Sequence, residues 1–406
     1  MRIALVTELP GPAPQAAGDA YPPSPASRVG SLATALAGLG AQVTVYAAVS
    51  APGRAGEAAA PEPVALCRGA VIEHLRVSPG GSLRRAARRR DIRHFADQLA
   101  ARWGRSAPEV VHAQSWSSGV AALAGSDGLC LPAVQTFHSL MAGTVAPGQR
   151  PSQEAARRIR LEVAIARRVD AALVATSDDA STLCRLGVPR NSIRVIPPGV
   201  DTARFTPDGP VASRGIRPRL LIVAGLADDP GPATALRALA DIPGAELVIA
   251  GGPPSSWLAA DADYQMLARL AGELRVADRV SFTGQVAAAG VPALMRSADV
   301  VLNLRLDGPL ARVTVEAMAC GTPVIAAEAG LHRDAVIDGT TGMLVPSADP
   351  SLLARRVRQL LASPMREGMA IAAASRAAER YSWARVGEET LAVYEAAVQR
   401  QHPGAA

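Results

Sequence analysis

Two rounds of alternating apolar strands and helices constrain the fold of this 406-residue chain more than any other feature. The first round opens with an apolar strand at 3–7, a helix at 27–39 and a second strand at 42–47. The alternation restarts at 220–224, after the polar, proline-containing segment 202–217. Strands that alternate with helices are typical of a parallel sheet covered by helices. We therefore predict an α/β protein with two Rossmann-like domains.

The best candidate ligand site is the stretch 314–326, TVEAMACGTPVIA. Apolar runs at 298–303 and 323–328 predict buried strands on either side, with a short helix at 315–319 between them. A loop that enters a helix between parallel strands is where an open α/β sheet binds its ligand, and a helix start suits a phosphate. Glu316, in the first turn, either hydrogen-bonds a sugar diol or only complements the helix dipole.

Composition and short motifs narrow the function classes. Neither half contains GxGxxG, so we expect no dinucleotide cofactor. The chain has no lysine, and its 42 basic residues are arginines spread along the sequence, which argues against nucleic-acid binding. The four cysteines show no metal or disulfide spacing. Without a signal-like or membrane-spanning apolar stretch, we expect a cytoplasmic protein.

One arginine cluster and two histidines have both a structural and a functional interpretation. The cluster Arg84–Arg90 is either a solvated helix start or a contact for an anionic membrane surface or acidic acceptor. His112 ends the predicted strand 109–113, and His138 follows the predicted strand 133–137. Ligands collect at the carboxyl ends of parallel strands, so a site role competes with a structural role at both histidines.

Several motifs together resemble a known family. They are VVHAQSWSSGVAAL at 110–123, QTFH at 135–138, RLGVPRNSIRVIPPGVD at 185–201, IAGGP at 249–253, MRSADVV at 295–301, EAMACGTPVIA at 316–326, DGTTGMLVP at 338–346 and RYSWARV at 380–386. Over nearly its whole length the chain resembles the GT-B glycosyltransferases, in particular retaining family 4 enzymes similar to actinobacterial inositol-phosphate glycosyltransferases. EAMACGTPVIA is the most specific of these motifs.

The resemblance implies a nucleotide-sugar donor, UDP- or GDP-linked, as co-substrate, with no metal and no other cofactor. It implies an acceptor domain at 1–205, a donor domain at 206–380 and a C-terminal helix within 381–406 that packs back across the domains. Glu316 would bind the ribose hydroxyls, and His138 would lie beside the donor sugar. The other implied donor residues are Gly225, Gly251, Gly252, Gly308, Pro309, Val313, Thr314 and Val315. The implied acceptor side holds Arg28, His112, Gln114 and Trp116.

The sequence departs from the family where the donor diphosphate would be held. Leu226 and Gly231 stand where the family has an arginine and a lysine, and Asp228 and Asp229 lie between them. In the family this cationic pair stabilises the leaving diphosphate. Losing one such group costs about 10²- to 10³-fold in rate.

Two more departures surround the candidate site. Gly308 replaces the first glutamate of the family's E-x7-E motif, leaving the shorter Asp307 beside it. Residues 23–25 replace a glycine pair, and Arg28 stands where the family often has histidine. Arg312 either supplies a compensating charge or is a solvent-exposed helix-start residue.

These observations favour a retaining hexosyltransferase that uses His138, Asp307 and Arg312 near the reacting centre. The missing basic pair favours a second hypothesis, a catalytically inactive relative that acts as a binding or regulatory partner. A nucleotide-sugar epimerase is a third hypothesis, against which the EAMACGTPVIA context speaks. Donor base, donor sugar and acceptor stay open; inositol phosphate, a lipid, a glycan and a small metabolite are the acceptor candidates.

Overall fold

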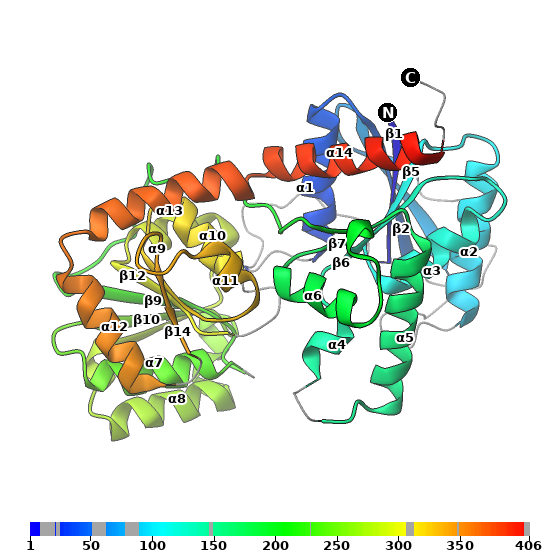
Figure 1. The fold of residues 1–406 in the computed structure, drawn as a ribbon. Helices are drawn as coiled ribbons and strands as arrows, with labels where there is room; N and C mark the ends of the chain where they lie inside the picture. Colours follow the sequence, from blue (N-terminus) through cyan, green and yellow to red (C-terminus); the bar gives the residue numbers. More distant parts are fainter. Residues whose placement is uncertain are drawn as a thin grey trace. The chain divides into compact units, whose positions relative to one another are not determined.

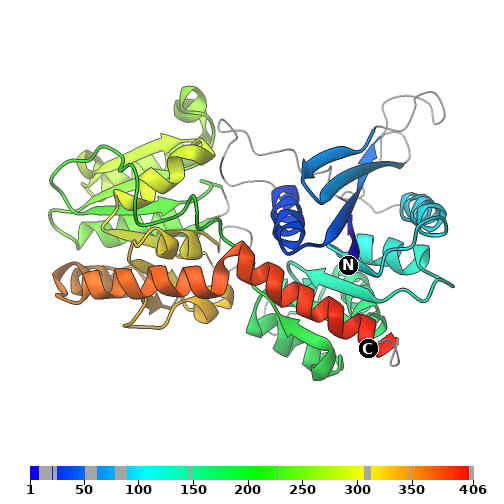
Figure 2. The ribbon, with the colours of Figure 1, turned by 90° about the horizontal axis from the view of Figure 1, so that it is seen from above.

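The computed structural model describes residues 1–8, 21, 25–50, 62–77, 89–145, 149–227, 229–305, 312–346 and 349–401. They form two compact units (Figures 1 and 2). The N-terminal unit comprises Met1–Gln15, Ser24–Gly199 and Trp383–Ala406, and the C-terminal unit comprises Ala16–Pro23 and Val200–Ser382. The expected division into an acceptor domain at 1–205 and a donor domain at 206–380 is a functional assignment, and it stays a prediction.

The N-terminal unit is built on an eight-stranded sheet in the order β3-β4-β2-β1-β5-β6-β7-β8. All neighbours are parallel except β3, which pairs antiparallel with β4. The strands are β1 Arg2–Thr7, β2 Gln42–Ser50, β3 Val64–Cys67, β4 Ala70–Val77, β5 Val110–Ala113, β6 Ala133–Phe137, β7 Ala171–Val174 and β8 Ile193–Val195. The helices are α1 Pro25–Gly38, α2 Arg89–Trp103, α3 Trp116–Gly125, α4 Met141–Thr144, α5 Gln153–Arg168, α6 Ser177–Arg185 and α14 Trp383–Gln401, with the 3-10 turn η1 Arg190–Ser192.

The C-terminal unit holds a six-stranded parallel sheet in the order β11-β10-β9-β12-β13-β14. Its strands are β9 Arg219–Val223, β10 Glu246–Ala250, β11 Val280–Gly284, β12 Val300–Asn303, β13 Val324–Ala327 and β14 Met343–Val345. Its helices are α7 Pro230–Ala240, α8 Ala262–Glu273, α9 Val291–Arg296, α10 Arg312–Ala319, α11 Gly330–Ala335, α12 Pro350–Ala362 and α13 Arg366–Tyr381. The 3-10 turns are η2 Ser255–Ala260, η3 Ala277–Arg279 and η4 Ala288–Gly290.

The central strands are nearly continuous apolar runs because helices bury both faces of each sheet. Every residue of β9, β12 and β13 is buried. The predicted two-domain α/β architecture is therefore confirmed, with parallel central strands in both units. In the N-terminal unit, α14 lies along α1, where a Cβ on Gly387 would sit 3.1 Å from Ala35 Cβ.

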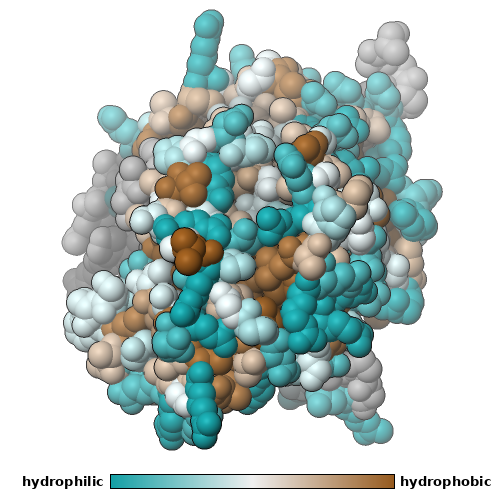
Figure 3. Space-filling model, turned by 90° about the vertical axis from the view of Figure 1, so that its left-hand side faces the viewer, coloured by the Kyte–Doolittle hydropathy of each residue, from teal (hydrophilic) through white to brown (hydrophobic). Residues whose placement is uncertain are grey.

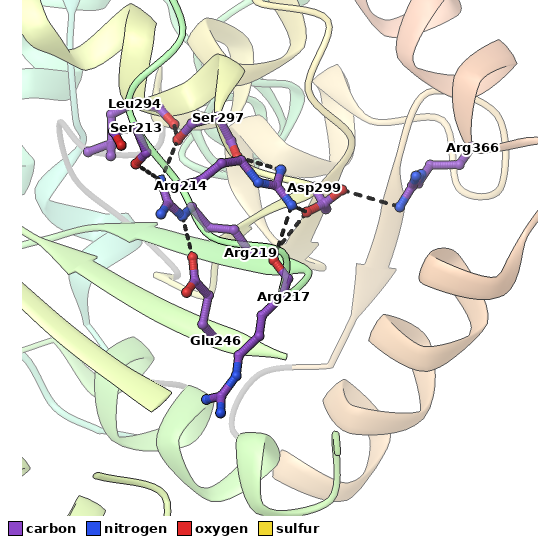
Figure 4. A network of polar contacts seen from close by, with 9 residues as sticks. All are labelled: Ser213, Arg214, Arg217, Arg219, Glu246, Leu294, Ser297, Asp299 and Arg366. Carbon is purple, nitrogen blue, oxygen red and sulfur yellow. Dashed lines mark hydrogen bonds and ion pairs between the residues drawn. The ribbon is translucent and has the colours of Figure 1, made fainter. Parts of the chain in front are cut away.

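A polar network joins residues at the amino ends of β9 and β12 (Figure 4). Asp299 accepts from Arg214 at 2.6 Å and from the backbone N–H of Arg219 at 2.8 Å. The Arg219 side chain donates to Glu246 at 2.6 Å and to Ser297 at 3.0 Å. The candidate site described below lies at the opposite, carboxyl end of β12, where α10 follows.

The surface of the described residues is mixed in character. On the face viewed in Figure 3, brown apolar side chains stand as spots interrupted by teal hydrophilic ones, which is ordinary for a globular protein. None of the helices in the described ranges combines the length and apolar character that a membrane crossing requires. Within the cluster Arg84–Arg90, residues 84–88 lie outside the described residues, and Arg89 and Arg90 begin α2. The membrane contact stays a prediction.

Candidate functional site

Helix α10 places Glu316 at the carboxyl end of the C-terminal sheet. The helix follows β12 and precedes β13, and the two strands pair in parallel. Val313 and Val315 are buried in the apolar core of the unit. Arg312 and Glu316, four residues apart, therefore share another face of the helix.

Glu316 is a buried carboxylate with two protein partners. Its relative exposure is 5%. Oε1 lies 3.2 Å from Arg312 Nε, and Oε2 accepts a hydrogen bond from the Tyr21 hydroxyl. Burial raises the pKa of Glu316, while Arg312 and the Tyr21 hydroxyl act to lower it. The predicted diol-binding residue thus stands beside a cation, and Arg312 is not the exposed helix-start residue that one interpretation proposed.

A directed set of hydrogen bonds joins the two sides of segment 306–311. Asn303 Nδ2 donates to Thr314 Oγ1 at 3.2 Å, and Thr314 Oγ1 lies 2.9 Å from His332 Nδ1. His332 Nε2 lies 2.9 Å from the carbonyl oxygen of Arg305. A carbonyl only accepts, so His332 carries its proton on Nε2 and accepts from Thr314 on Nδ1. Burial lowers the pKa of His332, which agrees with this neutral form.

The start of α7 is already occupied by a carboxylate of the protein. Asp229 accepts from the Gly231 N–H at 2.8 Å as the N-cap, which satisfies a free donor of the helix start. Its other oxygen lies 3.6 Å from Arg305 Nη1, and the Asp229 side chain is only 3% exposed. Asp229 thus takes a position that suits an external anion, with Arg305 as its counter-charge.

Leu226, at the other position where the family has a basic residue, belongs to the apolar core. It is 5% exposed, and a Cβ on Gly252 would lie 2.8 Å from Leu226 Cδ1. Gly251, with φ +132°, approaches the end of β9 so closely that a Cβ would lie 2.0 Å from the carbonyl oxygen of Ala224. The glycines at 251 and 252 therefore have a packing role inside the unit, beside any role toward a donor.

The structure describes only some of the other residues that were predicted to bind the donor. Gly225 follows β9, and Thr314 carries the hydrogen bonds described above. Asp307, Gly308 and Pro309 lie outside the described residues, as does Asp228.

In the N-terminal unit, His138 and Arg28 lie near each other. His138 directly follows β6 and its side chain is exposed. Desolvation and then the positive charge of Arg28 lower the pKa of His138. His138 is therefore neutral at pH 7. His138 was predicted beside the donor sugar and Arg28 on the acceptor side, and both roles stay predictions.

His112 is fully buried and bound by its own protein. Nδ1 lies 2.5 Å from the Tyr394 hydroxyl on α14, and Nε2 lies 2.7 Å from Thr136 Oγ1. Burial lowers the pKa of His112 to about 3. Gln114 is also buried, and Trp116 is half-buried with Arg158 over its ring at 5.9 Å. An acceptor could contact His112 only if a protein partner moved, so its predicted acceptor role remains a prediction.

Sequence reasoning missed Tyr21, Arg305 and His332. Tyr21 and His332 contact the helix of Glu316 from 295 and 18 residues away along the chain. Tyr21 and His332 lie outside the motifs that the sequence offered, and Arg305 lies just before the candidate site without having been given a role. Among the described residues, no group of three or more His, Cys, Asp or Glu side chains is arranged to hold a metal ion.

Solved structures agree with the two-unit architecture. Sucrose-phosphate synthase from Thermosynechococcus elongatus superposes with a TM-score of 0.76 over 100% of both chains, at 24% sequence identity. HepE from Anabaena, solved in complex with UDP, gives a TM-score of 0.72 over 98% of this chain and 100% of that chain, at 17% identity. At these identities the likeness concerns the fold alone, and the fold is that of the GT-B glycosyltransferases.

Sequence comparison gives the family. The family model described as Glycosyltransferase Family 4 matches residues 26–204, and that described as Glycosyl transferases group 1 matches residues 210–377. D-inositol 3-phosphate glycosyltransferase from Mycolicibacterium smegmatis is 34% identical over 309 residues, 73% of this chain and 69% of that protein. The protein of that name from Mycobacterium tuberculosis is 34% identical over 71% of this chain and 62% of its own length. The chain belongs to the family 4, group 1 glycosyltransferases.

Proposed function

We propose that this chain transfers a hexose from a nucleoside-diphosphate sugar to an acceptor, with retention of configuration and without a metal ion. The observation that supports this most is the buried Glu316 carboxylate beside Arg312 at the carboxyl end of the C-terminal sheet. A carboxylate accepts two hydroxyl donors at once, which suits the vicinal diol of a ribose. The start of α10, with the backbone of Val313 and Thr314, suits the adjoining phosphate.

The donor's base is proposed from a neighbour of the same fold. HepE from Anabaena was solved in complex with UDP-glucose, and its TM-score with this chain is 0.69 over 98% of the chain. We therefore place UDP-sugars first among donors, with GDP-sugars as the comparison.

Two arginines are proposed to stabilise the leaving diphosphate. Arg305 and Arg312 flank segment 306–311, which contains the predicted donor residues Asp307, Gly308 and Pro309. Neither Leu226 nor Gly231 can supply the charge. Positive groups fixed where charge develops lower the barrier without reorganisation, and a guanidinium can hold a phosphate with two parallel hydrogen bonds.

The acceptor is proposed to be a phosphorylated cyclitol. The relatives that match over most of this chain are named D-inositol 3-phosphate glycosyltransferases. Arg28 supplies a cation for the acceptor phosphate in this proposal, and neutral His138 supplies a hydrogen bond to a sugar hydroxyl. Gln114 and Trp116 are proposed to line the same side.

A direct test combines binding and turnover. Isothermal titration with UDP- and GDP-sugars measures donor affinity, and turnover with inositol 3-phosphate against free inositol measures acceptor choice. Proton NMR of the product's anomeric signal reports retention, and EDTA reports metal dependence. Glu316→Gln should lose donor affinity about tenfold or more, while Glu273→Gln, at the exposed end of α8, should not. No binding of any nucleotide sugar would refute the proposal.

A second function is favoured by one observation, the Asp229 carboxylate that caps α7 where an anion could bind. It is that of a relative that binds nucleotide sugar without turning it over. Donor binding with no transfer to any acceptor, under conditions in which a matched active relative works, would favour this alternative.

A further inference from the structure

Tyr21 is buried in the C-terminal unit, although the segments before and after it belong to the N-terminal unit. Ala16–Pro23 belongs to the C-terminal unit, whereas Met1–Gln15 and Ser24–Gly199 belong to the other. Tyr21 is 7% exposed and belongs to the apolar cluster that also holds Val313 and Ala317. Its backbone N–H donates to the carbonyl oxygen of Val286 at 3.0 Å. Both backbone and side chain of this residue are therefore held by the C-terminal unit.

The side chain of Tyr21 contacts both charged groups of the candidate donor site, the Glu316 carboxylate and the Arg312 guanidinium. Its hydroxyl donates to Oε2 of Glu316, and the Arg312 guanidinium lies over its ring, 5.7 Å from the centroid. Burial and then the charge of Glu316 raise the pKa of Tyr21 well above its ordinary value, so the phenol keeps its proton and donates. Tyr21 thus offers these residues a hydroxyl for the carboxylate and an aromatic face for the cation.

A nucleotide offers the same chemistry. A ribose hydroxyl donates to a carboxylate as the phenol does, and a base presents an aromatic face. Glu316 is 5% exposed with one oxygen beside Arg312 and the other bonded to Tyr21. A ribose can therefore reach Glu316 only after the Tyr21 hydroxyl has left.

We propose that Tyr21 is an internal competitor of the nucleotide donor, an autoinhibitory contact in which its phenol takes the place of a ribose hydroxyl on Glu316. The proposal rests on the proposed function, because it assigns Glu316 to the donor. When the donor binds, it displaces the phenol. Breaking the Tyr21 contacts costs free energy, so the donor binds more weakly than it would to a site without this contact.

Two variants separate the hydroxyl from the ring. Tyr21→Phe leaves the ring but removes the hydroxyl that donates to Glu316 Oε2, which weakens the blocked state and leaves the open state unchanged. Tyr21→Ala removes both. Tyr264→Phe is the matched control, because Tyr264 on α8 lies against Phe282 with ring centroids 5.0 Å apart.

The first measurement is isothermal titration of UDP, with GDP in parallel, against the full chain. Tyr21→Phe should bind the nucleotide about tenfold more tightly than wild type, as expected for losing one hydrogen bond to a charged acceptor in the competing state. Tyr21→Ala should bind at least as tightly as Tyr21→Phe, and Tyr264→Phe should match wild type. Far-ultraviolet circular dichroism checks that each variant is folded.

The second measurement observes Tyr21 itself. The chain has five tyrosines, so labelling with 3-fluorotyrosine gives five ¹⁹F signals, and Tyr21→Phe assigns the one of interest. Saturating UDP should shift the Tyr21 signal toward that of a solvent-exposed tyrosine, with the Tyr264 signal unchanged.

Three results would overturn the proposal. If wild type binds UDP or GDP and the Tyr21 variants bind no more tightly, Tyr21 is a structural anchor and the proposed function still stands. If nucleotide saturates the protein and the Tyr21 signal does not move, the donor does not displace it. If neither wild type nor Tyr21→Ala binds UDP or GDP, the proposed function fails and this inference fails with it.

Discussion

Arg312 Nε lies 3.2 Å from Glu316 Oε1, one helical turn away on α10, and the two side chains are only 12% and 6% exposed. Water therefore screens this ion pair poorly. Removing one partner of a buried pair costs more than the pair itself contributes, because the other charge is left uncompensated. Residues coupled in this way are better tested together than singly.

Arg312→Gln is expected to lower both stability and activity. The free energy of unfolding, measured with urea, should fall by about 3 kcal/mol because Glu316 is left as an uncompensated buried carboxylate. Donor turnover should fall about 10²-fold if Arg312 stabilises the leaving diphosphate.

The double variant Arg312→Gln with Glu316→Gln separates the two effects. It should recover most of the lost stability, since no buried charge remains, and it should recover none of the turnover. If Arg312→Gln turned over donor at the wild-type rate, Arg312 would not stabilise the leaving diphosphate, even if the variant were less stable.

Strands and helices that follow from a local apolar pattern could be predicted from the sequence. The apolar run and following helix around Glu316 were expected at 298–303 and 315–319, and the structure has β12 at Val300–Asn303 and α10 at Arg312–Ala319. Helix α13, Arg366–Tyr381, was missed; two of its four buried residues, Ala373 and Ala377, are alanines, which mark a buried face less clearly than larger apolar residues do. The antiparallel edge strand β3 was also missed; none of its four residues is buried, so it differs from the buried strands on which the prediction was based.

What surrounds Glu316 could not be predicted, because it depends on long-range packing. Tyr21 lies in a proline-rich stretch that resembles a linker, and its partner is 295 residues away. His332 lies outside the specific motif, and its role follows only from hydrogen-bond directions at both ring nitrogens. Leu226 could be recognised as a lost basic residue, but its burial against Gly252 required coordinates.

Thr314→Val is expected to destabilise the C-terminal unit, while Thr314→Ser is not. Valine keeps the shape of threonine but removes the hydroxyl that accepts from Asn303 and donates to His332. Buried groups left unpaired cost about 1–3 kcal/mol, which urea unfolding resolves. Serine keeps the hydroxyl and should stay within about 1 kcal/mol of wild type. Equal stability of the two variants would contradict the assigned hydrogen bonds.

Stability is expected to fall as the solution becomes acidic, and His112 should contribute to the slope. The pKa of His112 is lowered to about 3 in the folded protein, while an unfolded histidine has about 6.5. Between these values the unfolded state binds more protons, so stability rises with pH and is lost as pH falls below about 6.5. The loss approaches about 1.4 kcal/mol per pH unit. Burial lowers the pKa of His332 too, so it acts in the same direction.

Urea unfolding of wild type and His112→Phe at several values between about pH 7.5 and about pH 5 tests this slope. His112→Phe should be less stable at neutral pH, since the hydroxyls of Thr136 and Tyr394 lose their partner. Its stability should nevertheless depend less steeply on pH than that of wild type. Equal slopes would show that His112 is not held neutral by burial.

Leu226→Arg, which restores one of the family's two basic residues, is not expected to restore a diphosphate contact, because the side chain at position 226 is buried in the apolar core. Leu226 is 5% exposed in an apolar cluster, with the backbone of Gly252 directly against it. In Leu226→Arg the guanidinium either stays buried without a partner or turns outward and leaves a cavity, and both cost about 3 kcal/mol or more. Leu226→Met is the matched control and should cost less than about 1.5 kcal/mol.

Gly231→Lys meets a related obstacle, since a Cβ there would lie 3.0 Å from the Oδ1 of Asp229 that caps α7. Donor turnover of Leu226→Arg with Gly231→Lys should therefore not exceed that of wild type, and urea unfolding should show the loss of stability. If Leu226→Arg were as stable as Leu226→Met and bound donor more tightly, position 226 would face the donor. Arg305 and Arg312 would then no longer be needed to explain how the diphosphate is held.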